Sequence, residues 1–170
     1  MKKYLAALVC GFGAGVLQIV PLIKTFSCCF ILPLAVFFAL ILDQRANNTF
    51  GKITFKKGIL FGLFTGLFAA AFGSVLEILI TFITRQNDVI VGFAELEKMI
   101  NGFPVTSEIR QQVISLFQQV RNDLLNYGFS WFYTISILVN NFIVNSIFGI
   151  VGGLIATQLI NNKFKNESDL

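Results

Sequence analysis

The sequence predicts an all-α membrane protein with four transmembrane helices and an extracytoplasmic amphipathic helical segment between the third and the fourth. Two observations support this fold class. Hydrophobic residues make up 55% of the 170 residues and charged residues only 13%, whereas average soluble domains are about 25% charged. The apolar residues are also concentrated in four long runs, and a spanning helix needs roughly 20 such residues. The length suits one domain, 1–170.

The first two predicted helices, 4–23 and 26–42, form a helical hairpin. A tight turn around Lys24 and Thr25 joins them, with Pro21 just before it. Pro33 should kink the second helix, because proline leaves the carbonyl of Cys29 without its helical partner. A cleavable signal peptide is the alternative interpretation of the first run, although no A-x-A-like cleavage site follows it.

The third and fourth predicted helices, 57–84 and 131–161, exceed the length that a bilayer requires, so we expect them to tilt or protrude. Small residues recur every four positions in the first, third and fourth runs, which lets another helix backbone approach closely. We expect them to pack inside one bundle, and homo-oligomerisation or the lining of a narrow pathway is the alternative. These glycines are Gly11, Gly15, Gly58, Gly62, Gly66, Gly149 and Gly153.

Region 86–130, between the last two runs, has an amphipathic pattern. A helix can begin at Thr106 or Ser107, and its apolar residues are spaced by three and four positions. A shorter pattern, 93–103, precedes it and ends at Pro104. We expect two helices on the outer membrane surface or over the mouth of the bundle. They either cover helix ends or serve partner binding or gating.

Basic residues predict the orientation of the chain. Eight of the 13 fall on the side that holds both termini, and the other five are offset by acidic residues. The positive-inside rule therefore places both termini in the cytoplasm. The eight residues are Lys2, Lys3, Arg45, Lys52, Lys56, Lys57, Lys163 and Lys165.

Polar residues inside the runs form the main candidate site. They are Gln18, Glu77, Asn140, Asn141 and Asn145. With a rise of about 1.5 Å per residue, Gln18, Glu77 and Asn141 fall about 7 to 9 Å outward of their run midpoints, in one layer. An ionised carboxylate at that depth is costly, so we expect protonated Glu77 bonded to an asparagine. Structural stabilisation is one interpretation of this layer, and a proton or cation site is the other.

Several classes of function are disfavoured. The chain has no histidine, which removes the commonest general base and metal ligand. The three cysteines, Cys10, Cys28 and Cys29, have no zinc-binding spacing. No nucleophile motif, phosphate-binding loop or clustered basic patch for nucleic acid is present. We therefore predict no enzymatic activity, no catalytic residue, no cofactor, no metal and no nucleic-acid partner.

Four segments resemble small four-helix bacterial membrane proteins that are assigned only to domains of unknown function. They are Ser27-Cys28-Cys29, the stretch 53–58 that opens the third run, the stretch 148–153 in the fourth, and the outer helix 104–119. The second run differs from those proteins, because it has Pro33 and Leu34 where small residues are common. The resemblance covers nearly the whole chain and implies a bacterial cytoplasmic membrane.

The sequence therefore favours a structural or accessory protein of the bacterial cytoplasmic membrane. Its expected partners are the lipid bilayer and either another protein or a second copy of the chain. A small channel or transporter subunit that uses the polar layer around Glu77 is the alternative.

Overall fold

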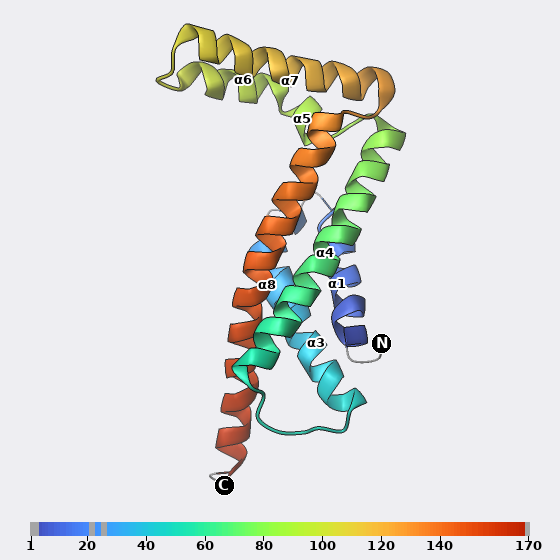
Figure 1. The fold of residues 1–170 in the computed structure, drawn as a ribbon, viewed down its shortest axis with the longest axis vertical. Helices are drawn as coiled ribbons and strands as arrows, with labels where there is room; N and C mark the ends of the chain where they lie inside the picture. Colours follow the sequence, from blue (N-terminus) through green and yellow to red (C-terminus); the bar gives the residue numbers. More distant parts are fainter. Residues whose placement is uncertain (1–3, 21–22, 25–26, 169–170) are drawn as a thin grey trace. The chain divides into compact units, whose positions relative to one another are not determined.

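The computed structural model describes residues 4–20, 23–24 and 27–168. Within these ranges the chain is helical and contains no strand (Figure 1). Three helical segments are long and apolar enough to cross a membrane: Cys29–Ala46, Phe55–Thr84 and Trp131–Phe164. The described chain is thus all-helical, with three candidate membrane spans and one shorter apolar helix.

The shorter apolar helix is α1 (Leu5–Leu17), which ends well before the expected residue 23. Its 13 residues rise about 20 Å, whereas the hydrocarbon core of a bilayer is about 30 Å thick. After Leu17 the hydrogen bonding changes to the 3₁₀ type, because the N–H groups of Ile19 and Val20 donate to carbonyls three residues earlier. The sequence supplies a reason, since Pro21 disfavours helical geometry in the residue before it. Pro21 and Thr25 of the expected turn lie outside the described residues.

Pro33 reshapes the start of the second helix. A π-helical turn, η2 (Ser27–Ile31), leads directly into α3 (Leu32–Ala46). The ring of Pro33 would clash with the carbonyl of Cys29 in a regular α-helix, and a wider π-turn relieves this clash. Below Pro33, α3 continues four residues beyond the expected residue 42, so Asp43 and Gln44 are helical and buried.

α3 ends in a Schellman motif. Asn48 has a positive φ of 49°, which asparagine tolerates better than most residues. The N–H of Asn48 donates to the carbonyl of Arg45 at 3.3 Å, and that of Thr49 donates to the carbonyl of Gln44 at 3.0 Å. This pair of bonds satisfies the last helical carbonyls and fixes the direction in which the 47–54 loop leaves the helix.

Two long helices, α4 (Phe55–Thr84) and α8 (Trp131–Ser168), run through two compact units. The bundle unit comprises residues up to Leu76 together with those from Leu138 onward. The second unit comprises Glu77–Ile137. At 30 and 38 residues, both helices are longer than the roughly 20 residues that span a bilayer.

In the bundle unit, glycines of α4 and α8 bring the two backbones into contact. A Cβ added at Gly62 would overlap the carbonyl oxygen of Gly149, and one added at Gly153 would overlap that of Gly58. A Cβ at Gly66 would likewise overlap the carbonyl oxygen of Asn145. No side chain larger than hydrogen fits at these positions without moving a helix.

A neighbouring face of α4 contacts α1 in the same way. A Cβ at Gly11 would lie 2.7 Å from the carbonyl oxygen of Thr65, and one at Gly15 would lie 2.9 Å from that of Ala69. α8 also meets α3, since a Cβ at Gly152 would lie 2.7 Å from the Cα of Pro33. Around these contacts lies a core whose buried members are Ala7, Val36, Ala39, Leu40, Ile53, Phe61, Ala156 and Ile160.

The second unit contains α5 (Asp88–Val91), α6 (Phe93–Gly102) and α7 (Ser107–Tyr127). Thr106 occupies the N-cap position of α7, and Gly128 ends the helix with a φ of 70°. Val120 and Leu124 of the expected apolar stripe are buried against Tyr133. In contrast, the side chains of Ile109 and Leu116 are 50% and 39% exposed.

Gly62→Ala should destabilise the protein, because its methyl group must displace the backbone of Gly149. Overpacking of this kind costs about 1 to 3 kcal/mol. Thermal unfolding in a neutral detergent, followed by circular dichroism, measures the effect. Gly13→Ala is the matched control, because a Cβ there meets nothing within 4 Å and alanine favours the helix. Equal midpoints for the two variants would contradict the proposed backbone contact.

Candidate functional site

Three residues of the predicted polar layer meet inside the bundle unit. Gln18, the C-cap of α1, donates from Nε2 to Oδ1 of Asn145 at 2.6 Å. Asn145 donates from Nδ2 to the carbonyl of Asn141 at 2.9 Å and contacts Oε1 of Gln18 at 3.4 Å. Asn145 is only 3% exposed. The two amides therefore face each other as a reciprocal pair that ties α1 to α8.

Asn141 bonds to Ser74 of α4, a residue that the predicted polar site does not include. Its Nδ2 donates to Oγ of Ser74 at 3.0 Å, and Ser74 is fully buried. Asn140 is exposed instead. Glu77 is half-buried three residues beyond Ser74 on α4 and belongs to the second unit. The layer in the bundle is thus a neutral set of three amides and one hydroxyl that bond to one another.

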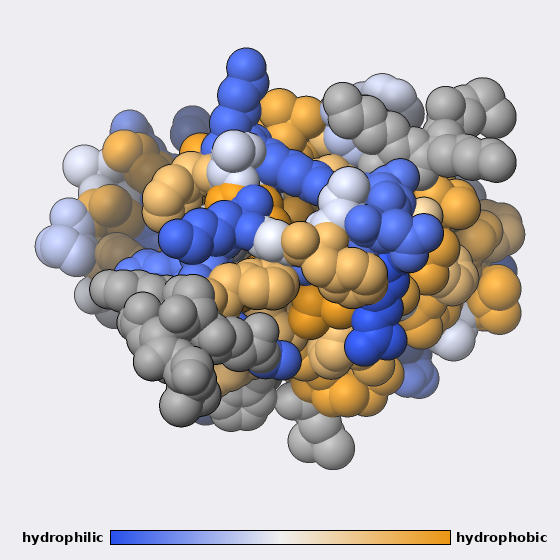
Figure 2. Space-filling model, turned by 90° about the horizontal axis from the view of Figure 1, so that it is seen from below, coloured by the Kyte–Doolittle hydropathy of each residue, from blue (hydrophilic) through white to orange (hydrophobic). Residues whose placement is uncertain are grey.

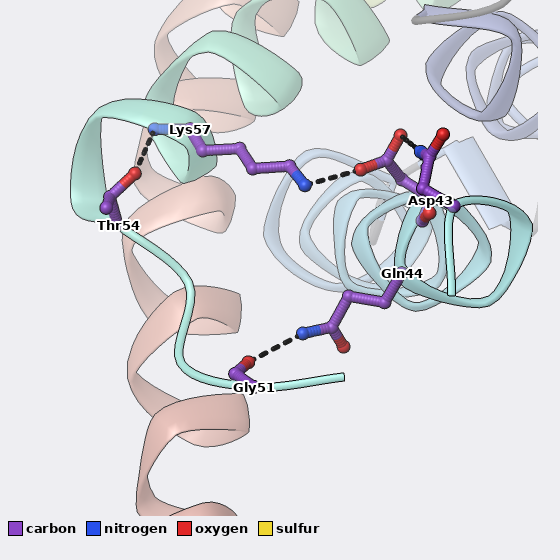
Figure 3. A network of polar contacts seen from close by, with 6 residues as sticks. Asp43, Gln44, Gly51, Thr54 and Lys57 are labelled. Atoms are coloured by element: carbon purple, nitrogen blue, oxygen red, sulfur yellow. Dashed lines mark hydrogen bonds and ion pairs between the residues drawn. The ribbon is translucent and has the colours of Figure 1, made fainter. Parts of the chain in front are cut away.

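A second polar cluster lies where α3 ends and α4 begins (Figure 3). Nζ of Lys57 lies 2.6 Å from Oδ2 of Asp43, and Nδ2 of Asn47 donates to Oδ1 of the same carboxylate at 2.9 Å. The Asp43 side chain is 5% exposed and that of Lys57 is 35% exposed. Both carboxylate oxygens therefore have a partner, which a buried charge requires.

The 47–54 loop that closes this cluster is held by further bonds. Nε2 of Gln44 donates to the carbonyl of Gly51 at 2.8 Å. Asn161 of α8 bonds to both backbone groups of Ile53, accepting from its N–H at 2.7 Å and donating to its carbonyl at 2.9 Å. The loop is thus attached to α3 and to α8 through backbone groups.

A pocket of about 600 Å³ adjoins the ion pair. Leu60 and Phe61 form part of its apolar wall. Its polar lining includes both members of the ion pair and four further residues: Asp43, Lys57, Asn47, Thr49, Thr54 and Lys56. Figure 2 shows the molecule from below, turned by 90° from the view of Figure 1, and this face carries a group of hydrophilic residues between hydrophobic ones. This pocket is a candidate binding site.

Sequence reasoning missed this pocket, although one signal for it exists. Asp43 is the only acidic residue before Glu77. Four basic residues follow this carboxylate, which stands alone at the end of an apolar run. This pattern indicates an ion pair between the carboxylate and one of them. Its partner Lys57 is separated from it by the whole loop, so no helical spacing indicates the contact.

Comparison with known proteins places the chain in no family. No protein-family model, no curated protein and no solved structure matches it. Among the described residues, no three His, Cys, Asp or Glu side chains are grouped so that they could hold a metal ion. The contacts and charges of the pocket itself are therefore what indicate its chemistry.

Lys57→Met should destabilise the bundle, because it leaves the buried Asp43 carboxylate without its cation. Breaking a fully buried pair costs about 3 to 5 kcal/mol, and the partial exposure of Lys57 lowers our expectation to about 2 kcal/mol. The double variant Asp43→Leu/Lys57→Met should recover most of this loss in thermal unfolding. A double variant less stable than Lys57→Met alone would contradict the pairing.

Proposed function

We propose that this chain is a four-span membrane protein with an accessory or structural role, and that both of its termini are cytoplasmic. Three segments satisfy the length and composition of spans. Large apolar side chains remain exposed along them, Phe38, Leu79 and Ile143 among others. A lipid environment accounts for side chains of this kind, which would be costly to expose to water.

The proposal adds one span to these three segments. It is the first in chain order, and it begins with α1 and continues beyond it. Apolar residues run on from Leu17 to Ile23, with Gln18 as the polar exception. The N–H of Lys24 donates to the carbonyl of Val20, four residues earlier, at 2.8 Å, which is the spacing of an α-helical bond. Close packing of Gly11 and Gly15 against α4 supports placing α1 alongside a span.

The proposed orientation uses the basic residues around the 47–54 loop and near the end of α8. Arg45, Lys52 and Lys56 are exposed around the 47–54 loop, and Lys163 is exposed near the end of α8. Lys2 and Lys3 lie outside the described residues. The basic residues of the second unit are interspersed with Glu95, Glu97, Glu108 and other acidic residues, as expected for a non-cytoplasmic segment.

Maleimide labelling tests this topology in a chain whose three cysteines are replaced by serine. Asn122→Cys in α7 should react with an impermeant maleimide in intact cells, because α7 is placed outside. Lys163→Cys should react only after lysis. Both positions are exposed, so accessibility within the protein does not differ between them. The reverse labelling pattern would overturn the proposed orientation.

The observation that favours an accessory role is the mutual satisfaction of the polar layer. Gln18, Asn141, Asn145 and Ser74 bond to one another, and carbonyl oxygens fill the space beside the glycines. Groups committed in this way hold helices together, as interhelical polar bonds do in membranes. The exposed apolar residues of the second unit, such as Met99 and Ile109, offer a surface to a protein partner or a second copy.

One observation favours the alternative of a channel or transporter subunit. Glu77 places a carboxyl group within an apolar helix, three residues beyond the bonded Ser74. Ionisable residues within spans mark proton or ion pathways by default. The two functions therefore differ in whether Glu77 supports flux.

Proton flux into proteoliposomes separates these two functions. An accessory protein should give wild-type flux equal to that of empty liposomes, and Glu77→Gln should give the same value. A proton pathway through Glu77 should give flux above that background, and Glu77→Gln should abolish it while the protein remains folded. Flux of the second kind would overturn the accessory role.

A further inference from the structure

The pocket beside the Asp43–Lys57 pair has a surplus of positive charge. Lys57 neutralises the Asp43 carboxylate, and Asn47 donates a hydrogen bond to its other oxygen. Lys56 adds an exposed cation to the same lining. The pocket also lies at the N-terminus of α4, where the helix dipole is positive. These charges favour an anion.

Hydrogen-bond donors in the pocket indicate what kind of anion it suits. Thr49 and Thr54 bring hydroxyl groups, and Lys57 retains donors beyond the one directed at Asp43. A group with several acceptor oxygens can use more than one of these donors at once. Phosphate has this character and binds lysine and hydroxyl groups well.

The surroundings of the pocket favour a phosphate that carries acyl chains. Leu60 and Phe61, the apolar lining, lie one turn further along α4 than the lysines. Phe50 and Phe55 are 68% and 56% exposed. Phe50 lies two residues before Lys52, and Phe55 directly precedes Lys56. Alternating aromatic and basic residues at the end of a span are typical of the headgroup level of a bilayer.

From these observations we propose that the pocket binds the phosphate of an anionic phospholipid headgroup. A zwitterionic headgroup fits less well, because the carboxylate that could receive its ammonium is buried and already bonded. The proposal uses the membrane placement proposed above but not the accessory role. Maleimide labelling reports failure of that placement separately.

Titration of the purified protein in neutral detergent with short-chain phosphatidylglycerol tests the proposal. Bound lipid should raise the midpoint of thermal unfolding in a saturable way, which gives an apparent Kd. Lys56→Gln should raise this Kd about fivefold, as expected for the loss of one lysine near anionic lipid. Lys163→Gln is the matched control, because Lys163 is also exposed in the bundle unit but does not line the pocket, and it should change the Kd less than twofold.

Thr49→Val keeps every charge and removes one pocket hydroxyl, so it should also weaken binding. Equal weakening by Lys56→Gln and Lys163→Gln, with Thr49→Val unchanged, would show diffuse attraction and overturn the site. Equal stabilisation by phosphatidylcholine would overturn the preference for an anion. Binding of soluble glycerol phosphate as tight as that of the lipid would overturn the lipid as its source. Midpoints measured without lipid show whether each variant is folded.

Discussion

The arrangement of the bundle depends on how closely the backbone of α4 approaches its neighbours. In a bilayer, helices gain little from the hydrophobic effect when they associate, so packing and polar contacts must hold them. α4 meets α8 through Gly58, Gly62 and Gly66, and it meets α1 through the adjacent face at Thr65 and Ala69. Direct contact between backbones maximises dispersion and brings Cα–H groups towards carbonyl oxygens.

This close approach is also what allows the polar layer to form. Amide side chains are short, and they can bond across two helices only where the helix axes are near each other. Asn145 takes part in both features, because its carbonyl oxygen lies against Gly66 while its side chain pairs with Gln18. An unsatisfied amide in lipid would cost several kcal/mol. Separating α4 from α8 would therefore also break the bond from Asn141 to Ser74.

Helix periodicity explains how much of this arrangement could be predicted from the sequence. A recurrence of four places small residues on one face, and a constant rise predicts similar depths for Gln18, Glu77 and Asn141. The partner that Gln18 contacts is instead Asn145, one turn along α8 from Asn141. Which helix each face meets is not encoded in spacing, so the bond from Asn141 to Ser74 could not be predicted. The end of α1 at Leu17 and the extension of α3 to Ala46 depend on turn geometry and capping, which hydrophobic patterns do not describe.

The cluster at Asp43 is a second contact that could not be predicted from the spacing of residues in the sequence. A carboxylate whose side chain is only 5% exposed is stable only if its partners are already in place. Lys57 reaches it because other bonds hold the loop closed. The Schellman motif sets the start of the loop, the Gln44 bond holds Gly51, and Asn161 holds Ile53. These bonds end on backbone groups, so they fix the loop whatever its other side chains are. The shape of the pocket is therefore separable from its charge: exposed Lys56 adjusts the charge alone, whereas Lys57 also stabilises the buried carboxylate.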